Sequence, residues 1–154
     1  MAGDSPEVLM IIVQENSIEK VWTMLRNMCL TIEISKNVLW FFTNVLSKEY
    51  YKGDLVLIVR MVGVIIENNC FEEQLFESCT MVLDKVSKKQ PVLEKFDNCW
   101  SEISMILVKI IYYLTNEYEK LQENTIAYSL NFIGMFLLGK DEMIEVFFNL
   151  FYHK

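Results

Sequence analysis

Glycine and proline are scarce in this chain of 154 residues, which has five glycines and two prolines. A fold with many turns needs more of both residues, and a disordered chain would have far fewer apolar residues than the 53% found here. Long helices are therefore favoured. A chain of this length can bury a core without disulfides or a metal, so we expect one all-helical domain over residues 1–154 with no linker.

Histidine occurs only once, at His153, next to the last residue. A preorganised site is difficult to build at a chain end, which argues against most Cys–His, Ser–His and histidine–metal arrangements. The sequence also lacks a phosphate-binding glycine loop, an HExxH motif and a GxSxG motif. Glu72, Glu73, Glu77 and Asp84 have the spacing of a solvated helix face. We expect a protein that is not an enzyme and that has no cofactor and no metal.

Basic residues are outnumbered, with 14 Lys and Arg against 21 Asp and Glu, and the net charge is −7. The largest basic cluster is the pair Lys88 and Lys89. A surface that follows phosphates, and with it nucleic-acid binding, is therefore not expected. An acidic surface instead favours a basic protein or peptide as the partner.

Long apolar runs are also missing. The longest uncharged stretch, residues 124–139, is shorter than the roughly 20 residues of a membrane-spanning helix, and it contains Ser129 and Asn131. The segment MAGDSPEV at the N-terminus has no basic region and no small-residue cleavage site. The four cysteines form no CxxC pair, which is typical of reduced structural thiols. We expect no membrane binding and a cytoplasmic or nuclear location.

Apolar residues recur at helical spacing along most of the chain. The pattern and its capping residues predict helices over about 7–14, 17–30, 35–50, 55–67, 70–88, 102–120, 124–138 and 141–151, with a short one that begins at Pro91 and Ser101 as a cap. Asp54 is expected to cap the helix after it, although the β-branched residues of this segment would also suit a buried strand. The starts at Ser17, Asp54 and Pro91 are 37 residues apart, which is typical of a helical-repeat array.

Trp40 stands in an unusual place for a tryptophan. On a helix, Asn37, Trp40 and Asn44 share one stripe, so the ring accompanies polar residues rather than the apolar face. An aromatic ring flanked by amides suits a groove for an extended peptide, because the amide can pair with the main chain and the ring can stack on an aliphatic or cationic side chain. The alternative is that Trp40 covers the edge of the core and Asn44 is solvated.

The same combination recurs at a step of 36 residues. Steps from Trp40 lead to three aromatic residues, Phe76, Tyr112 and Phe148. Steps from Asn44 lead to mostly polar residues, Thr80, Asn116 and Tyr152. A repeat array also needs polar outer faces at its ends, whereas residues 145–152 are mostly apolar and aromatic. The candidate partner-binding residues are therefore Asn37, Trp40, Asn44, Phe76, Tyr112, Asn116, Phe148 and Phe151.

The segment LWFFTNVL, residues 39–46, resembles the third-helix signature of importin-alpha-type armadillo repeats, in which Trp and Asn stand four residues apart as Trp40 and Asn44 do. IYYLTN around Tyr112 and Asn116 resembles a degraded copy, and VRMVGVIIENN, residues 59–69, is similar to the family's Arg-x-Val-Gly-Asn variant with Val64 in place of the Asn. The resemblance implies a right-handed α-solenoid of about four helical pairs, armadillo- or HEAT-like. It also implies a concave face that holds a peptide, with Trp40 in a lysine pocket and Asn44 gripping the peptide backbone.

These observations predict a non-catalytic adaptor that binds a segment of a partner protein through a helical groove or an apolar face. Two alternatives stay open. One is a subunit of an obligate dimer or larger assembly, with a homodimer formed through the apolar C-terminal helix. The other is a compact helical bundle similar to the Bcl-2-like regulators, which would bind an amphipathic helix, although that family's Asn-Trp-Gly-Arg signature is absent.

Overall fold

The computed structural model describes residues 17–26, 30–48, 54–89 and 99–139, together with Glu145 and Asn149. These residues form α2 (Ser17–Arg26), α3 (Ile32–Leu46), α4 (Leu55–Asn68), α5 (Glu73–Ser87), α6 (Trp100–Asn116), the 3-10 helix η2 (Tyr118–Lys120) and α7 (Glu123–Gly139). No strand occurs in the ranges above, and the predicted all-helical class is confirmed. The helices predicted over 7–14 and from Pro91 fall on residues outside the description. Of the helix predicted over 141–151, only Glu145 and Asn149 are described, and both are helical.

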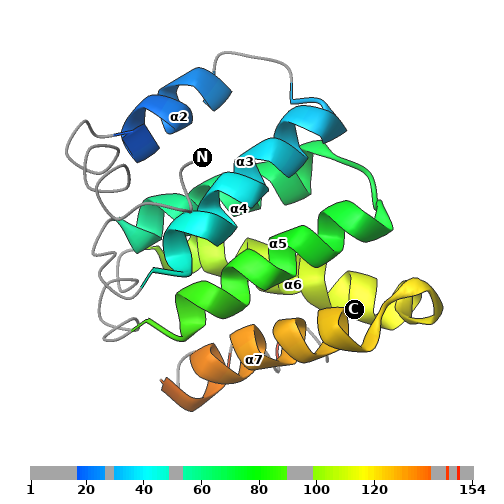
Figure 1. Cartoon of the computed structure of the whole chain (residues 1–154). Helices are drawn as coiled ribbons and strands as arrows, with labels where there is room; N and C mark the ends of the chain where they lie inside the picture. The colour runs from blue at the N-terminus through cyan, green and yellow to red at the C-terminus, as the bar shows by residue number, and fades with distance from the viewer. Residues whose placement is uncertain are drawn as a thin grey trace.

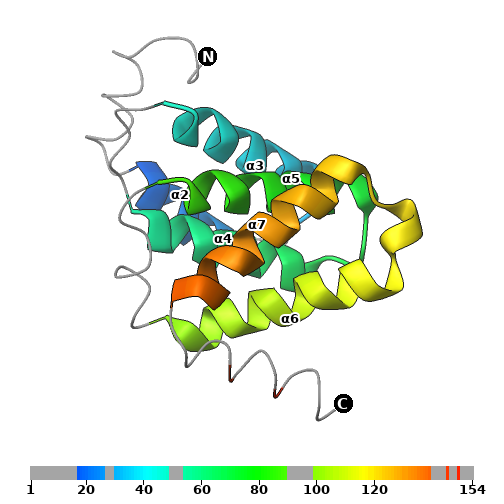
Figure 2. The same ribbon diagram turned by 90° about the horizontal axis from the view of Figure 1, so that it is seen from below.

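The helices form two layers that alternate along the chain (Figures 1 and 2). In one layer α5 packs between α3 and α7, and in the other α4 packs between α2 and α6. The layers are joined where α4 packs on α3 and α5 and where α6 packs on α7. Each successive pair of helices, α2 with α3, α4 with α5 and α6 with α7, therefore lies beside the next pair.

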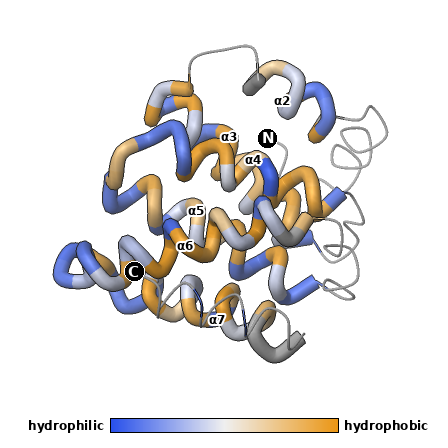
Figure 3. The backbone as a smooth tube through the Cα atoms, turned by 180° about the vertical axis from the view of Figure 1, so that it is seen from behind, coloured by the Kyte–Doolittle hydropathy of each residue, from blue (hydrophilic) through white to orange (hydrophobic). Residues whose placement is uncertain are grey.

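The core lies between the two layers, and apolar residues recur along each of the labelled helices (Figure 3). Its largest fully buried side chains come from five different helices: Phe42, Phe132, Phe136, Leu39, Ile58, Met61, Ile65, Leu83, Ile103 and Leu107. Because every layer contributes to this cluster, burial of apolar surface holds the described helices together.

The predicted cap of α4 is confirmed. Asp54 Oδ1 accepts a hydrogen bond from the backbone N–H of Leu57 at 3.0 Å, which pairs one of the donors that a helix start leaves free. The segment that follows is a helix rather than a strand, despite its β-branched residues. It is buried along most of its length because α2, α3, α5 and α6 all pack against it.

Two predicted helix starts are wrong. Helix α3 begins three residues earlier than expected, and α6 begins at Trp100 rather than after a Ser101 cap. Of the helix predicted over 17–30, residues 17–26 are helical and Leu30 is not, and 27–29 lie outside the description. The first two starts of the predicted 37-residue period agree with Ser17 and with the Asp54 cap of α4. The third, Pro91, lies outside the described residues, so the period stays a prediction.

Candidate interaction groove

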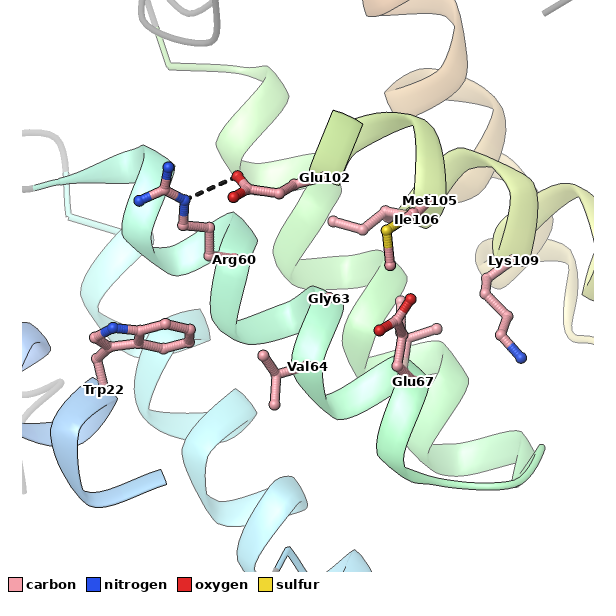
Figure 4. Close-up of a pocket in the computed structure, with 10 residues that line it drawn as sticks. Trp22, Arg60, Gly63, Val64, Glu67, Glu102, Met105, Ile106 and Lys109 are labelled. Carbon is pink, nitrogen blue, oxygen red and sulfur yellow. Dashed lines mark hydrogen bonds and ion pairs between the residues drawn. The ribbon is translucent and has the colours of Figure 1, made fainter. Parts of the chain in front are cut away.

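A groove of about 300 Å³ lies across the layer of α2, α4 and α6 (Figure 4). We call it the α4 groove. Three helices line it, and the lining residues are Trp22, Arg60, Gly63, Val64, Ile66, Glu67, Glu102, Met105, Ile106 and Lys109. Helix α4 supplies half of them, and four of these follow the i, i+3, i+4, i+7 spacing of a single helix face. Trp22 comes from α2 on one side, and the last four residues come from α6 on the other.

Gly63 stands at the centre of this face. A Cβ atom there would lie 3.1 Å from Ile106 Cδ1 and 3.2 Å from Ile106 Cγ1, which is closer than ordinary van der Waals contact. The missing side chain therefore lets α4 and α6 approach each other closely. At this position α4 contributes only backbone to the lining of the groove.

One end of the groove holds an ion pair between α4 and α6. Arg60 Nε donates to Glu102 Oε2 at 2.9 Å, and Arg60 Nη2 donates to Cys99 Sγ at 3.3 Å. The hydrogen bond to Glu102 is the main reason that the pKa of the Arg60 guanidinium is raised above its ordinary value. Both charged side chains are partly exposed, so we expect a contribution to stability of at most about 1 kcal/mol. The pair mainly fixes the register of α4 against α6.

The other end lies two helical turns away, at Glu67 and Lys109. Glu67 is exposed, and in the part of the chain that the structure describes it has no ion-pair partner. Lys109 Nζ lies 5.8 Å from the centroid of the Tyr113 ring, in a cation–π contact. Glu67 and Lys109 are therefore the two charged side chains of the groove without an ion-pair partner among the described residues, and Lys109 in addition contacts a ring.

The described lining of the groove is mostly apolar. Its ten residues include no histidine, cysteine or serine, and its two carboxylates, Glu67 and Glu102, belong to opposite ends. Across residues 17–26, 30–48, 54–89 and 99–139, no group of three His, Cys, Asp or Glu side chains is arranged to hold a metal ion. The described helices also include none that is long and apolar enough to cross a bilayer.

The predicted stripe on α3 lies outside the groove, in the other layer. Trp40 is 52% exposed, Asn37 is exposed and Asn44 is half-buried. The Asn44 Nδ2 group donates to the backbone carbonyl of Trp40 at 2.9 Å, so one of its N–H groups is used within the helix. The prediction that these residues bind a partner stays a prediction.

The predicted exposure of α5 residues is wrong. Phe76 is only 3% exposed and packs against the rings of Phe71 and Tyr113, with centroids 5.9 and 5.1 Å away. Asp84, expected on a solvated helix face, and Thr80, expected in the place that Asn44 has in the repeat, are buried as well. The physical reason is that α5 lies between α3 and α7 and packs on α4, which covers this face.

Tyr112 and Asn116 form a surface pair on α6. Tyr112 is 47% exposed, and Asn116 Nδ2 donates to the Tyr112 carbonyl at 2.9 Å, as Asn44 does to Trp40. However, α6 belongs to the layer of α4 and α3 belongs to the other layer. The step of 36 residues therefore does not place Trp40 and Tyr112 on one face. Phe148 and Phe151 lie outside the described residues.

Sequence reasoning missed the α4 groove. The sequence analysis places its central residues only in the segment VRMVGVIIENN. One local signal was available, because Gly63 is a poor helix former in the middle of a strongly predicted helix. A glycine in such a position often marks a close approach of two backbones.

No family model matches this chain, and no curated protein or solved structure matches it either.

Proposed function

We propose that this protein is a non-catalytic interaction module that binds a segment of a partner protein in the α4 groove. The observation that carries the proposal is the groove itself, which is open, about 300 Å³ in volume, and has charged side chains at both ends. The lining also contains the apolar side chains of Trp22, Val64, Met105 and Ile106, and Met105 is 48% exposed. Apolar surface with a few charged groups at its margin is the usual make-up of a protein-binding site.

We also propose that the helices form an armadillo- or HEAT-like right-handed α-solenoid. The order of packing supports this, because each pair of helices lies beside the next and the first pair makes little contact with the last. In a compact bundle the outer helices would close around a shared core. A solenoid of this kind presents each of its two layers as a continuous surface.

The stripe of Asn37, Trp40 and Asn44 is the second candidate surface. The exposed indole of Trp40 favours it, since a tryptophan at the surface is a typical anchor in protein interfaces. This stripe and the α4 groove lie in different layers, so a single substitution changes one without touching the other.

The test is capture of partners by the tagged full-length chain from its native extract, with three variants compared. Met105→Glu introduces a charge into the groove at a side chain that is 48% exposed, so folding is expected to survive. Leu130→Glu is the matched control, because Leu130 is an apolar residue of α7 in the other layer and is 56% exposed. Trp40→Ala tests the stripe on α3.

We expect Met105→Glu to lose a partner that the wild-type chain, Leu130→Glu and Trp40→Ala all retain. Thermal unfolding of each variant shows whether the fold is intact. Loss of the partner with Trp40→Ala, but not with Met105→Glu, would move the binding site to α3. Retention of every partner by Met105→Glu and Trp40→Ala would contradict both surfaces.

A further inference from the structure

We infer that the segment bound in the α4 groove is an amphipathic α-helix that places a Lys or Arg side chain beside Glu67. This inference rests on the proposed function, and it differs from the extended peptide that the armadillo resemblance implies. It follows from three properties of the groove: the hydrogen-bonding groups that it lacks, its length, and its charge.

The groove offers almost nothing to the main chain of an extended peptide. None of its ten lining residues is Asn, Gln, Ser, Thr or Tyr. Apart from the Trp22 indole, its polar side chains are four charged ones, and Arg60 and Glu102 are already paired with each other. The lining residues also lie within helices, where most backbone groups are bonded along the helix.

An extended peptide in this groove would therefore leave its own N–H and C=O groups unpaired against apolar surface. Every such buried group costs free energy, which is why nearly all of them are paired in native structures. A helix pairs these groups internally and presents only side chains to the groove. Recognition by apolar side chains alone thus favours a helical ligand.

The length of the groove fits two turns of such a helix. The positions of Arg60 and Glu67 on α4 are seven residues apart, and so are those of Glu102 and Lys109 on α6. Seven residues of α-helix span about 10 Å. A ligand helix lying along α4 would present apolar side chains at i, i+3 or i+4, and i+7 over this length.

The charge of the groove sets the direction of selectivity. The ion pair of Arg60 with Glu102 balances one end. At the other end Lys109 keeps its positive charge, and its Nζ lies 5.8 Å from the centroid of the Tyr113 ring. Glu67 remains exposed and without an ion-pair partner among the described residues. The chain as a whole carries a net charge of −7, which attracts basic ligands at long range. A basic side chain next to Glu67 is the complement of both features.

The experiment uses three fluorescent peptides and the full-length chain. Two are hydrocarbon-stapled, alanine-based helices with Leu at i, i+3, i+4 and i+7, identical except that one carries Lys and the other Glu at the positions beyond each end of the Leu run. The third has the sequence of the Lys helix, without the staple and with prolines that prevent a helix. Affinities are measured by fluorescence anisotropy at low ionic strength, where surface charge is least screened.

We expect the Lys helix to bind about fivefold more tightly than the Glu helix, the effect of one exposed ion pair, and more tightly than the proline peptide. Glu67→Lys is expected to remove or reverse the preference for the Lys helix. Glu33→Lys is the matched control, because it makes the same charge change on an exposed residue of α3 and is expected to keep the preference.

Each contrary result overturns a different part of the inference. Equal binding of the two helices, with loss of both on Met105→Glu, would refute the role of Glu67 and leave the groove as a helix-binding site. Binding of the proline peptide as tightly as the Lys helix would refute the helical ligand. Binding of all peptides that is unchanged by Met105→Glu, or no binding at all, would refute the groove and the proposed function with it.

Discussion

The contact of α5 with α7 contains a buried carboxylate whose loss of one partner can be predicted in detail. The side chain of Asp84 on α5 is 3% exposed. Its Oδ1 accepts from Asn131 Nδ2 of α7 at 3.0 Å, and its Oδ2 lies 2.9 Å from Lys88 Nζ of the same helix end. Asn131→Ala removes the donor that reaches Asp84 from α7, while the ion pair with Lys88 remains.

Two effects of opposite sign set the magnitude. A hydrogen bond to a charged group contributes roughly 1.5–3 kcal/mol to stability, and the lower end applies because Asn131 is exposed and water can replace part of its role. Alanine is the better helix former by roughly 0.7 kcal/mol at most. We expect a net loss of about 1 kcal/mol in the free energy of unfolding.

Asn116→Ala is the matched control. Asn116 is also exposed and also donates from Nδ2, but only to the carbonyl of Tyr112 within its own helix. Its replacement is expected to change stability by no more than about 0.5 kcal/mol. Urea unfolding at neutral pH measures both variants, and thermal unfolding adds a shift of roughly 2–4 °C for each kcal/mol. Equal stability of the two variants would refute the importance of the contact between Asp84 and Asn131.

Two further predictions concern the helix layer of the groove and the core. Asp54→Ala is expected to lower the free energy of unfolding by about 1 kcal/mol, because the cap to Leu57 is lost. Asp54→Asn is expected to keep most of the wild-type stability, because its amide oxygen can still accept from Leu57. Urea unfolding distinguishes the two variants. Burial raises the pKa of the Cys79 thiol, so the thiol loses its proton at a lower pH in the unfolded chain than in the folded one. The contribution of this group to the free energy of unfolding is therefore fully present below the ordinary thiol pKa of about 8.5, and it is lost as pH rises above that value. Denaturant unfolding from pH 7 to 10 should therefore show a shallower decline for Cys79→Ala than for the wild-type chain, and equal slopes would contradict the assignment.

The helices themselves could be predicted because their signals are local. Asp54 precedes a mostly apolar segment, and it caps the start of α4 as expected. Trp40 was expected to stand with polar residues, and its ring is half-exposed next to Asn37 and Asn44. Capping and periodicity depend on residues within one or two turns, which a sequence displays directly.

The buried face of α5 could not be predicted, because its polar side chains form hydrogen bonds with local or distant partners and are therefore buried. Thr80 is fully buried, and its hydroxyl donates to the carbonyl of Glu77 at 2.9 Å. Asp84 is buried because Asn131, 47 residues away in sequence, reaches it from α7. A pattern that counts polar residues as exposed therefore assigns this face to solvent, together with Phe76.

The α4 groove depends on register between helices, which periodicity does not contain. Its walls come from α2, α4 and α6, and the close approach of α4 to α6 is set by Gly63 against Ile106 and by Arg60 against Glu102. These pairs are separated by more than 40 residues. Only the glycine is visible in the sequence as an exception to its surroundings, and one exception does not identify its partner.

The surface amides of α3 and α6 and the lining of the α4 groove lead to one conclusion about ligand recognition. Asn44 and Asn116 each donate to a carbonyl of their own helix, so part of their capacity to hold the main chain of a ligand is already used. None of the described residues that line the α4 groove has an amide side chain. A ligand whose main chain needs hydrogen bonds from the protein gains few of them from these amides or from the groove. A helical ligand pairs its own backbone groups and needs none. We therefore expect affinity for this protein to rise with the helicity of the ligand and with the apolar area of the face that it presents. Among helices with the same apolar face, we expect the one with a basic side chain next to Glu67 to bind most tightly.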